Sequence, residues 1–167
     1  RTVASGNRFF ELMDRQPRVT SEPGAPSLRP GPGAVELAGL SLSYDGTRDA
    51  LTDVDLKVEP GETVALVGPT GSGKTSLVAL VARLYDPSEG IVRVDGIDVR
   101  DVDVESLRSE VAFVADDSFL FSASVADNIA YARPDATRED VEAAARRAQA
   151  HEFVAELPEG YDTVIGE

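Results

Sequence analysis

The sequence predicts an α/β fold, and three observations support that prediction. An apolar run at residues 63–67 indicates a buried strand; the glycine-rich residues 68–75 follow it, and residues 76–82 then have a helical pattern. Apolar and polar residues alternate over residues 35–44 and 51–58, as they do in antiparallel sheets. Beyond residue 115 the pattern is mainly helical. Together these observations predict a P-loop NTPase core with an antiparallel β-subdomain and the start of a helical subdomain.

Residues 68–75, Gly-Pro-Thr-Gly-Ser-Gly-Lys-Thr, match G-x-x-x-x-G-K-[ST], the pattern of a phosphate-binding P-loop. Its glycines let backbone N–H groups curl around a polyphosphate, because no Cβ stands in the way. The helix that follows points its positive N-terminal end at the same anion. Lys74 can reach the terminal phosphates, and Thr75 can offer its hydroxyl to Mg²⁺. An ordinary glycine-rich turn is the alternative, which the flanking strand and helix patterns disfavour.

The composition excludes several classes of function. The chain has 167 residues and a formal net charge of −14, which argues against a nucleic-acid partner because phosphate backbones require clustered Lys and Arg. Cys is absent, so neither a disulfide nor a thiolate–metal site is possible. No apolar run approaches the roughly 20 residues of a transmembrane helix, and we expect that this chain does not itself span a membrane.

Three regions are expected along the chain. Residues 1–15 place Phe9, Phe10 and Leu12 among charged side chains and predict the end of a helix that begins further upstream. Residues 16–33 are rich in Pro and Gly, which is typical of an extended linker. Residues 34–167 are expected to form the domain itself.

Within that domain, residues typical of turns and helix ends separate the predicted elements. Asp45-Gly46 and Pro60-Gly61 mark turns, Arg133-Pro134 ends a helix, and residues 137–140 resemble a capping box. The elements expected in order are strands at 35–44 and 51–58, a strand at 63–67, a helix at 76–82, a strand at 91–96, a short helix at 104–108, a core strand at 111–114, and helices at 124–131 and 137–150.

Further segments, together with the P-loop, resemble the nucleotide-binding domain of an ATP-binding cassette (ABC) transporter of the exporter type. Each is weak alone, but they occur in the family's order and cover nearly everything after residue 34. The segments are residues 40–44, 68–75, 84–90, 94–98, 105–108, 119–122, 127–129 and 157–163. The N-terminal helix also resembles the connector that joins membrane helices to this domain in exporters. The resemblance implies an incomplete domain, truncated before the family's signature motif.

The resemblance also implies roles for individual residues. Tyr44 falls at the position whose aromatic ring stacks on adenine; base–aromatic stacking contributes roughly 1–3 kcal/mol. Lys74 would be the electrostatic clamp on the phosphates and Thr75 a ligand of Mg²⁺. The implied ATP-binding residues are Tyr44, Gly68, Pro69, Thr70, Gly71, Ser72, Gly73, Lys74, Thr75 and Ser76. The alternative for Tyr44 is a strand-end aromatic that only packs on the sheet.

Asp116 departs from the family pattern, which has Gln at this position touching Mg²⁺ and the attacking water. A carboxylate could still hold Mg²⁺. Without the metal it would repel a triphosphate, by roughly 1 kcal/mol per charge pair at 4 Å in water and about 4 kcal/mol at an effective dielectric of 20. We therefore expect stronger dependence on Mg²⁺ and slower hydrolysis. The alternative is that Asp116 turns into solvent and the loop functions poorly.

Three family features are absent from the sequence: the signature Leu-Ser-Gly-Gly-Gln, the acidic strand end with its catalytic carboxylate, and the switch histidine. His151 matches no catalytic position and is expected to be a surface or packing residue. The resemblance implies ATPase activity as part of a full transporter, in which ATP and Mg²⁺ bind at a dimer of two such domains. The partners would be a second nucleotide-binding domain, in a homodimer or heterodimer, and a transmembrane domain, at the cytoplasmic side of the membrane. Asp116 further favours the less competent half of a heterodimer.

Two other classes remain open on the sequence. A soluble ABC-type ATPase of DNA repair or translation is disfavoured by the acidity and by the exporter-like residues 127–129. A P-loop small-molecule kinase would need an Arg-bearing lid, for which Arg146 and Arg147 are the candidates, although a solvated helix face is the simpler interpretation.

Overall fold

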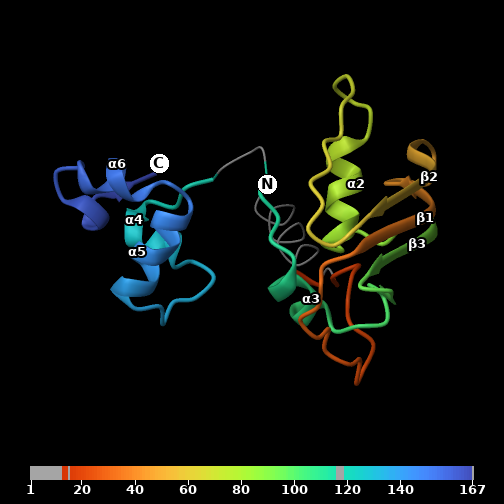
Figure 1. Ribbon diagram of the computed structural model, residues 1–167, viewed down its shortest axis with the longest axis horizontal. Helices are drawn as coiled ribbons and strands as arrows, with labels where there is room; N and C mark the ends of the chain where they lie inside the picture. The colour runs from red at the N-terminus through yellow and green to blue at the C-terminus, as the bar shows by residue number, and fades with distance from the viewer. Residues whose placement is uncertain (1–12, 15, 116–118, 167) are drawn as a thin grey trace, which may run out of the picture. The chain divides into compact units, whose positions relative to one another are not determined.

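The structure is a computed structural model that describes residues 13–14, 16–115 and 119–166 (Figure 1). It divides into two compact units, unit 1 up to Val114 and unit 2 from Ala115, which are described separately. Unit 1 contains β1 (Val35–Ser43), β2 (Asp49–Val58), α2 (Lys74–Val81), β3 (Glu89–Val94), β4 (Ile97–Asp98) and α3 (Val104–Glu110). Unit 2 contains β5 (Ala123–Ser124), α4 (Val125–Ile129), α5 (Arg138–Arg147), α6 (His151–Ala155), the 3₁₀ turn η1 (Gly160–Asp162) and β6 (Val164–Ile165).

A four-stranded antiparallel sheet in the order β2-β1-β3-β4 confirms the predicted antiparallel β-subdomain. Leu37 pairs with Leu56 but Leu40 pairs with Val54, so three residues on β1 advance while two advance on β2. This bulge explains why Leu37 and Leu40, three apart, are both buried, since regular alternation would place them on opposite faces.

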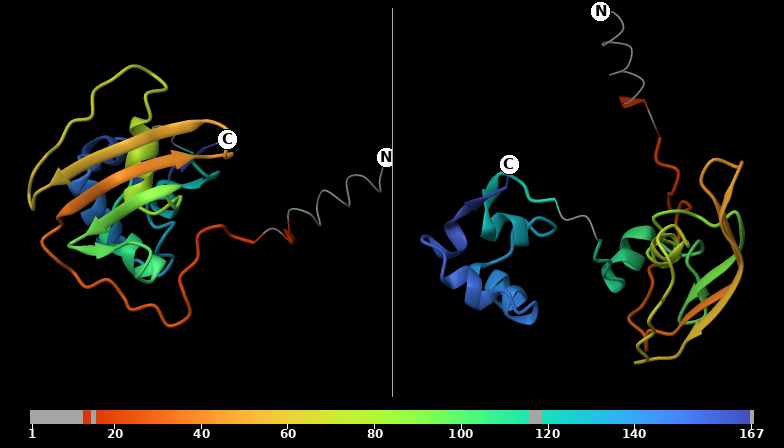
Figure 2. Two further views of the ribbon diagram at one scale, coloured as in Figure 1. Left: turned by 90° about the vertical axis from the view of Figure 1, so that its right-hand side faces the viewer. Right: turned by 90° about the horizontal axis from the view of Figure 1, so that it is seen from above.

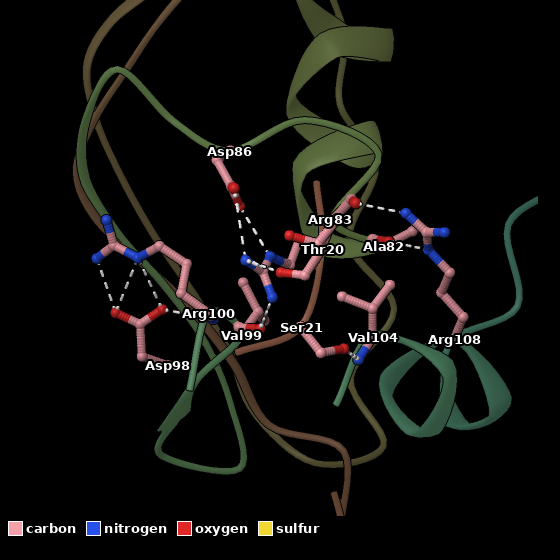
Figure 3. Close-up of polar contacts among 10 residues, drawn as sticks. All are labelled: Thr20, Ser21, Ala82, Arg83, Asp86, Asp98, Val99, Arg100, Val104 and Arg108. Atoms are coloured by element: carbon pink, nitrogen blue, oxygen red, sulfur yellow. Dashed lines mark hydrogen bonds and ion pairs between the residues drawn. The ribbon is translucent and has the colours of Figure 1, made fainter. Parts of the chain in front are cut away.

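Helix α2 lies against one face of this sheet, as Figure 2 shows in its left panel. A single apolar core joins the sheet to α2 and α3, and its fully buried members include Leu37, Leu40, Leu80, Val92 and Leu107. The carbonyls of Ala82 and Arg83, just past the last residue of α2, accept hydrogen bonds from the guanidinium of Arg108, which lies on α3 (Figure 3). A cation at this end of a helix also complements the helix dipole.

The predicted strands at residues 63–67 and 111–114 are wrong for the described part of the chain, where neither segment joins a sheet. Val67 is 94% exposed and Val114 is 92% exposed. A wholly apolar run is typical of a strand that is covered on both faces and paired on both sides. The described segments supply no such hydrogen-bonded neighbours, so the apolar pattern is present without the ladder that defines a strand.

Residues 17–33, which we call the strap, contain no helix or strand, yet they are held against unit 1. Ser21 Oγ donates to Asp103 Oδ1 at 2.9 Å and accepts from the backbone N–H of Val104 at 2.8 Å. Further along, Leu28 inserts into the core and is only 6% exposed. The hydrogen bonds from the Ser106 N–H and the Ser21 hydroxyl lower the pKa of the Asp103 carboxyl, which is also the N-cap of α3. The strap is therefore fastened to the first turn of α3. Of the connector helix expected at residues 1–15, only Met13 and Asp14 belong to the described residues.

We expect Ser21→Ala to lower the free energy of unfolding by about 1–2 kcal/mol, because it removes a donor to Asp103 and an acceptor for the N–H of Val104. Urea denaturation followed by circular dichroism measures the change. Ser27 is an exposed strap residue and provides the matched control: Ser27→Ala should leave the unfolding free energy within about 0.5 kcal/mol of the wild type. Equal losses in the two variants would contradict a specific role for Ser21.

Unit 2 packs α4, α5, α6 and η1 around a small core of Val125, Val141, Ala145, Val154 and Tyr161. The predicted capping box is confirmed: Thr137 caps the first turn of α5 and Asp140 bonds back to the Thr137 N–H. His151 Nδ1 lies 2.8 Å from the Tyr161 hydroxyl, which agrees with the packing role expected of this histidine. Among the described residues, no helix has the length and apolar character needed to cross a membrane.

Candidate nucleotide-binding site

The P-loop residues lead directly into α2, whose first residue is Lys74. Gly73 is the N-cap of this helix and, having no side chain, leaves the first backbone N–H groups uncapped. The first turn contains no acidic residue that could repel an anion. An eight-residue helix with a free, positively polarised N-terminus is a suitable partner for phosphate.

Glycine is required at position 73 for two independent reasons. Its φ of +86° lies in the left-handed region, which L side chains rarely adopt. A Cβ there would also lie 2.6 Å from Cδ2 of Leu51 and 2.7 Å from the carbonyl oxygen of Ala50, both on β2. The backbone of the loop can approach β2 this closely only without a side chain. This close contact with β2 positions Gly73 and, with it, the following Lys74.

Lys74 folds its ammonium group back into the loop. Nζ donates to the carbonyl oxygens of Gly68 and Pro69, at 2.9 Å each, and to Ser72 Oγ at 3.3 Å. All three acceptors are uncharged, whereas phosphate oxygens carry negative charge and add a direct Coulomb attraction to the hydrogen bond. Phosphate oxygens can therefore compete with the loop for this ammonium.

Thr75 and Ser76 follow Lys74 on the first turn of α2. Thr75 is exposed, so its hydroxyl is accessible to a metal–phosphate complex. Among the described residues, no group of three or more Asp, Glu or His side chains forms a metal site. Mg²⁺ bound with substrate phosphates needs only one or two protein ligands and keeps several waters. A single hydroxyl beside the phosphate loop fits that requirement.

Tyr44 is brought to the same helix by a contact that the sequence does not reveal. Its hydroxyl donates to Ser76 Oγ at 2.8 Å, while its ring meets the ring of Tyr85 edge to face at 5.0 Å and 82°. Tyr85 is the neighbour that sequence reasoning missed, because nothing in the spacing between residues 44 and 85 signals a contact. The structure thus brings Tyr44 and the P-loop helix together.

Two further predictions concern Asp116 and Arg146. Asp116, the departure from the family pattern, lies outside the described residues. Arg146, the candidate lid residue of a kinase, forms an i,i+4 ion pair with Glu142 at 2.8 Å on the surface of α5. This ion pair agrees with a solvated helix face.

Comparison with known proteins gives consistent matches. A family model described as ABC transporter matches residues 51–165. The putative multidrug export ATP-binding/permease protein YgaD of Bacillus subtilis is 45% identical over 167 residues, which cover 99% of this chain and 29% of the relative. The ATP-dependent lipid A-core flippase of Desulfotalea psychrophila is 42% identical over 165 residues, with coverage of 99% and 29%.

A solved structure agrees with these sequence matches. It is described as a bacterial Atm1-family ABC exporter with ATP bound, and it matches with a TM-score of 0.88 and 39% identity over 99% of this chain and 29% of that chain. The chain therefore spans less than a third of the length of each of these three proteins.

Proposed function

The chain belongs to the ABC transporter family, and on that premise we propose that it is the ATP-binding part of an exporter's motor domain. The observation that supports this most directly is the P-loop: a glycine-capped helix whose first residue, Lys74, holds its ammonium among neutral carbonyls. Such a loop binds a polyphosphate by charge, backbone donors and helix dipole together. The named relatives are exporters, which supports export over DNA repair, translation or small-molecule phosphorylation.

Each site residue has a distinct task in this proposal. Lys74 leaves the loop carbonyls and neutralises the terminal phosphates of ATP. Thr75 offers its exposed hydroxyl to Mg²⁺, which when bound neutralises further phosphate charge. The half-exposed ring of Tyr44 stacks on the base, and Ser76 holds that ring through the tyrosine hydroxyl. These residues bind and orient the nucleotide. In our proposal the general base and the residues that clamp ATP across a dimer come from outside this sequence.

Unit 2 provides support for a second partner, a transmembrane domain at the cytoplasmic side of the membrane. Phe119, Phe121 and Tyr131 are exposed and form a continuous aromatic cluster, with Phe121 stacked on Tyr131 at 4.5 Å. Asn128 fixes this cluster by bonding to both the N–H and the carbonyl of Phe121. Exposed aromatic groups held this rigidly are typical of protein interfaces. We propose that this cluster meets the membrane domain when two nucleotide-binding domains associate.

The proposal is tested by titrating the protein with a fluorescent ATP analogue, with and without Mg²⁺. We expect binding that strengthens with Mg²⁺. We also expect Asp116→Gln to reduce this dependence by about 3- to 10-fold, because it removes a carboxylate that the family resemblance assigns to the metal position. The charge of Asp116 also underlies our proposal that the site is the less competent half of a heterodimer. Binding without any response to Mg²⁺ would contradict the assigned metal role, and transfer of phosphate to a small acceptor would favour a kinase.

A further inference from the structure

Tyr44 and Tyr85 form an aromatic pair beside the P-loop helix. Tyr44 directly follows β1, and Tyr85 lies just beyond the C-terminus of α2, so the two come from different elements. Their ring centroids are 5.0 Å apart with an interplanar angle of 82°, an edge-to-face arrangement that aromatic pairs prefer. Tyr44 remains 46% exposed, so part of its surface is left free for a ligand.

Tyr85 is itself held firmly. Arg83, two residues before it, is buried and pairs with Asp86, the residue after it, at 2.8 Å. The backbone N–H of Leu84 donates to the carbonyl of Ala79 at 2.9 Å and so closes the end of α2. Tyr85 therefore lies in a short segment that is closed by an ion pair and by backbone hydrogen bonds, although its ring is half exposed.

Two contacts thus hold the ring of Tyr44, one at each end of α2. Its hydroxyl is bonded to Ser76, on the first turn, and its ring is in contact with Tyr85, beyond the last turn. Both contacts come from α2 and the segment that follows it, and neither comes from β1. A side chain that is already fixed loses less conformational freedom when a ligand stacks on it, and that difference increases affinity.

We propose that Tyr85 is a positioning residue that holds the Tyr44 ring ready to stack on the nucleotide base. The inference rests on the proposed function, in which Tyr44 contacts that base. Tyr85 does not touch the nucleotide in this arrangement; it acts through Tyr44. Its role therefore concerns ligands that carry a base and leaves binding of bare phosphate chains unaffected.

The test compares two ligands, Mg-ATP and Mg-tripolyphosphate, by isothermal titration calorimetry. Tyr85→Ala should weaken ATP binding about 3- to 10-fold and leave tripolyphosphate binding unchanged, since freeing one side chain costs on the order of a tenfold change or less. Tyr85→Phe keeps the ring and should restore ATP affinity to within about 2-fold of the wild type. Phe153, an exposed aromatic residue of unit 2, provides the control, and Phe153→Ala should alter neither titration.

Each contrary outcome identifies which idea is wrong. If Tyr44→Ala weakens ATP binding but Tyr85→Ala does not, the positioning role is overturned while the proposed function stands. Equal weakening of both ligands by Tyr85→Ala would show a general structural role and would also overturn the inference. If Tyr44→Ala leaves ATP and tripolyphosphate affinities unchanged, the base does not contact Tyr44, and the base-binding part of the proposed function is overturned as well.

Discussion

Replacing Lys74 with alanine is expected to weaken ATP binding about 30- to 100-fold. The ammonium group donates to three neutral acceptors in the loop, and in the bound state it would bond to charged phosphate oxygens. Hydrogen bonds to charged groups contribute about 1.5–3 kcal/mol each, and every 1.4 kcal/mol is a tenfold change in affinity. Equilibrium titration with a fluorescent ATP analogue in the presence of Mg²⁺ measures the loss.

Lys57 provides a matched control, because these two are the only lysines in the sequence. It lies on β2 and pairs with Glu59 at 2.7 Å, with both side chains more than half exposed. Lys57→Ala removes the same charge from the protein, so it accounts for any general effect of net charge on an anionic ligand. We expect it to change ATP affinity less than 2-fold, since exposed charges are screened beyond roughly 8 Å in physiological salt.

Lys74→Ala should leave the stability of the protein nearly unchanged. The loop carbonyls that Lys74 contacts are exposed, so water can replace the ammonium when it is removed. Unfolding free energies of Lys74→Ala and of the wild type should therefore agree within about 0.5 kcal/mol. A large loss of stability would mean that Lys74 holds the loop together and that weaker binding is a secondary effect. Unchanged ATP binding would refute the P-loop assignment.

Sequence reasoning succeeded where local patterns specify local structure. Turn and capping signals identified the antiparallel hairpin and the N-terminus of α5. The P-loop motif placed the following helix correctly to within two residues, since it was expected from Ser76 and α2 begins at Lys74. These features depend on residues that are close in sequence, or on an alternation of apolar and polar residues that remains recognisable despite the register shifts along β1. The residues of the phosphate loop could be named for the same reason, because their roles follow from backbone geometry.

What could not be predicted depends on partners that are distant in sequence. Ser21 reaches Val104 across 83 residues, and no composition rule indicates that a proline-rich segment will dock. The same limit applies to the pairing of Tyr44 with Tyr85. The strands expected at 63–67 and 111–114 are wrong for a related reason. Their apolar pattern is clear, but a strand also needs a hydrogen-bonded neighbouring strand, and the apolar pattern of one segment does not show whether such a neighbour is present.

Arg83→Ala is expected to lower the free energy of unfolding of unit 1 by about 2–4 kcal/mol. This guanidinium is the one buried charged side chain among the described residues, with the residue 5% exposed. It donates to Asp86 Oδ1 at 2.8 Å, to the carbonyl of Val99 at 3.2 Å and to the carbonyl of Thr20 in the strap at 3.4 Å (Figure 3). Removing the buried guanidinium leaves the two carbonyls and the carboxylate of Asp86, which is 35% exposed, without this donor, and unpaired acceptors are costly.

Arg100 makes a comparison possible within the same region. It pairs with Asp98 at 2.7 Å, but its side chain is 39% exposed, against 6% for the side chain of Arg83. Its partner Asp98 is 16% exposed but keeps the backbone N–H of residue 100 as a donor at 2.9 Å when the side chain is removed. Pairs with an exposed partner contribute about 0–1 kcal/mol, so Arg100→Ala should cost no more than about 1 kcal/mol. Urea denaturation of both variants, followed by circular dichroism, measures the contrast. Equal losses would show that burial does not govern these two pairs.

A double variant separates two contributions to the stability loss: the unpaired carboxylate of Asp86 and the lost packing of the Arg83 side chain. Arg83→Met keeps most of the apolar stem, and Asp86→Asn removes the carboxylate that Arg83→Met would leave without its ion-pair partner. If that carboxylate is the main cost, the double variant should be more stable than Arg83→Met alone by about 1 kcal/mol. If instead the bonds to Thr20 and Val99 dominate, Asp86→Asn should bring no recovery. The strap would then be held to the end of α2 chiefly through Arg83, and Ser21→Ala should have a smaller effect in the Arg83→Met background than in the wild type.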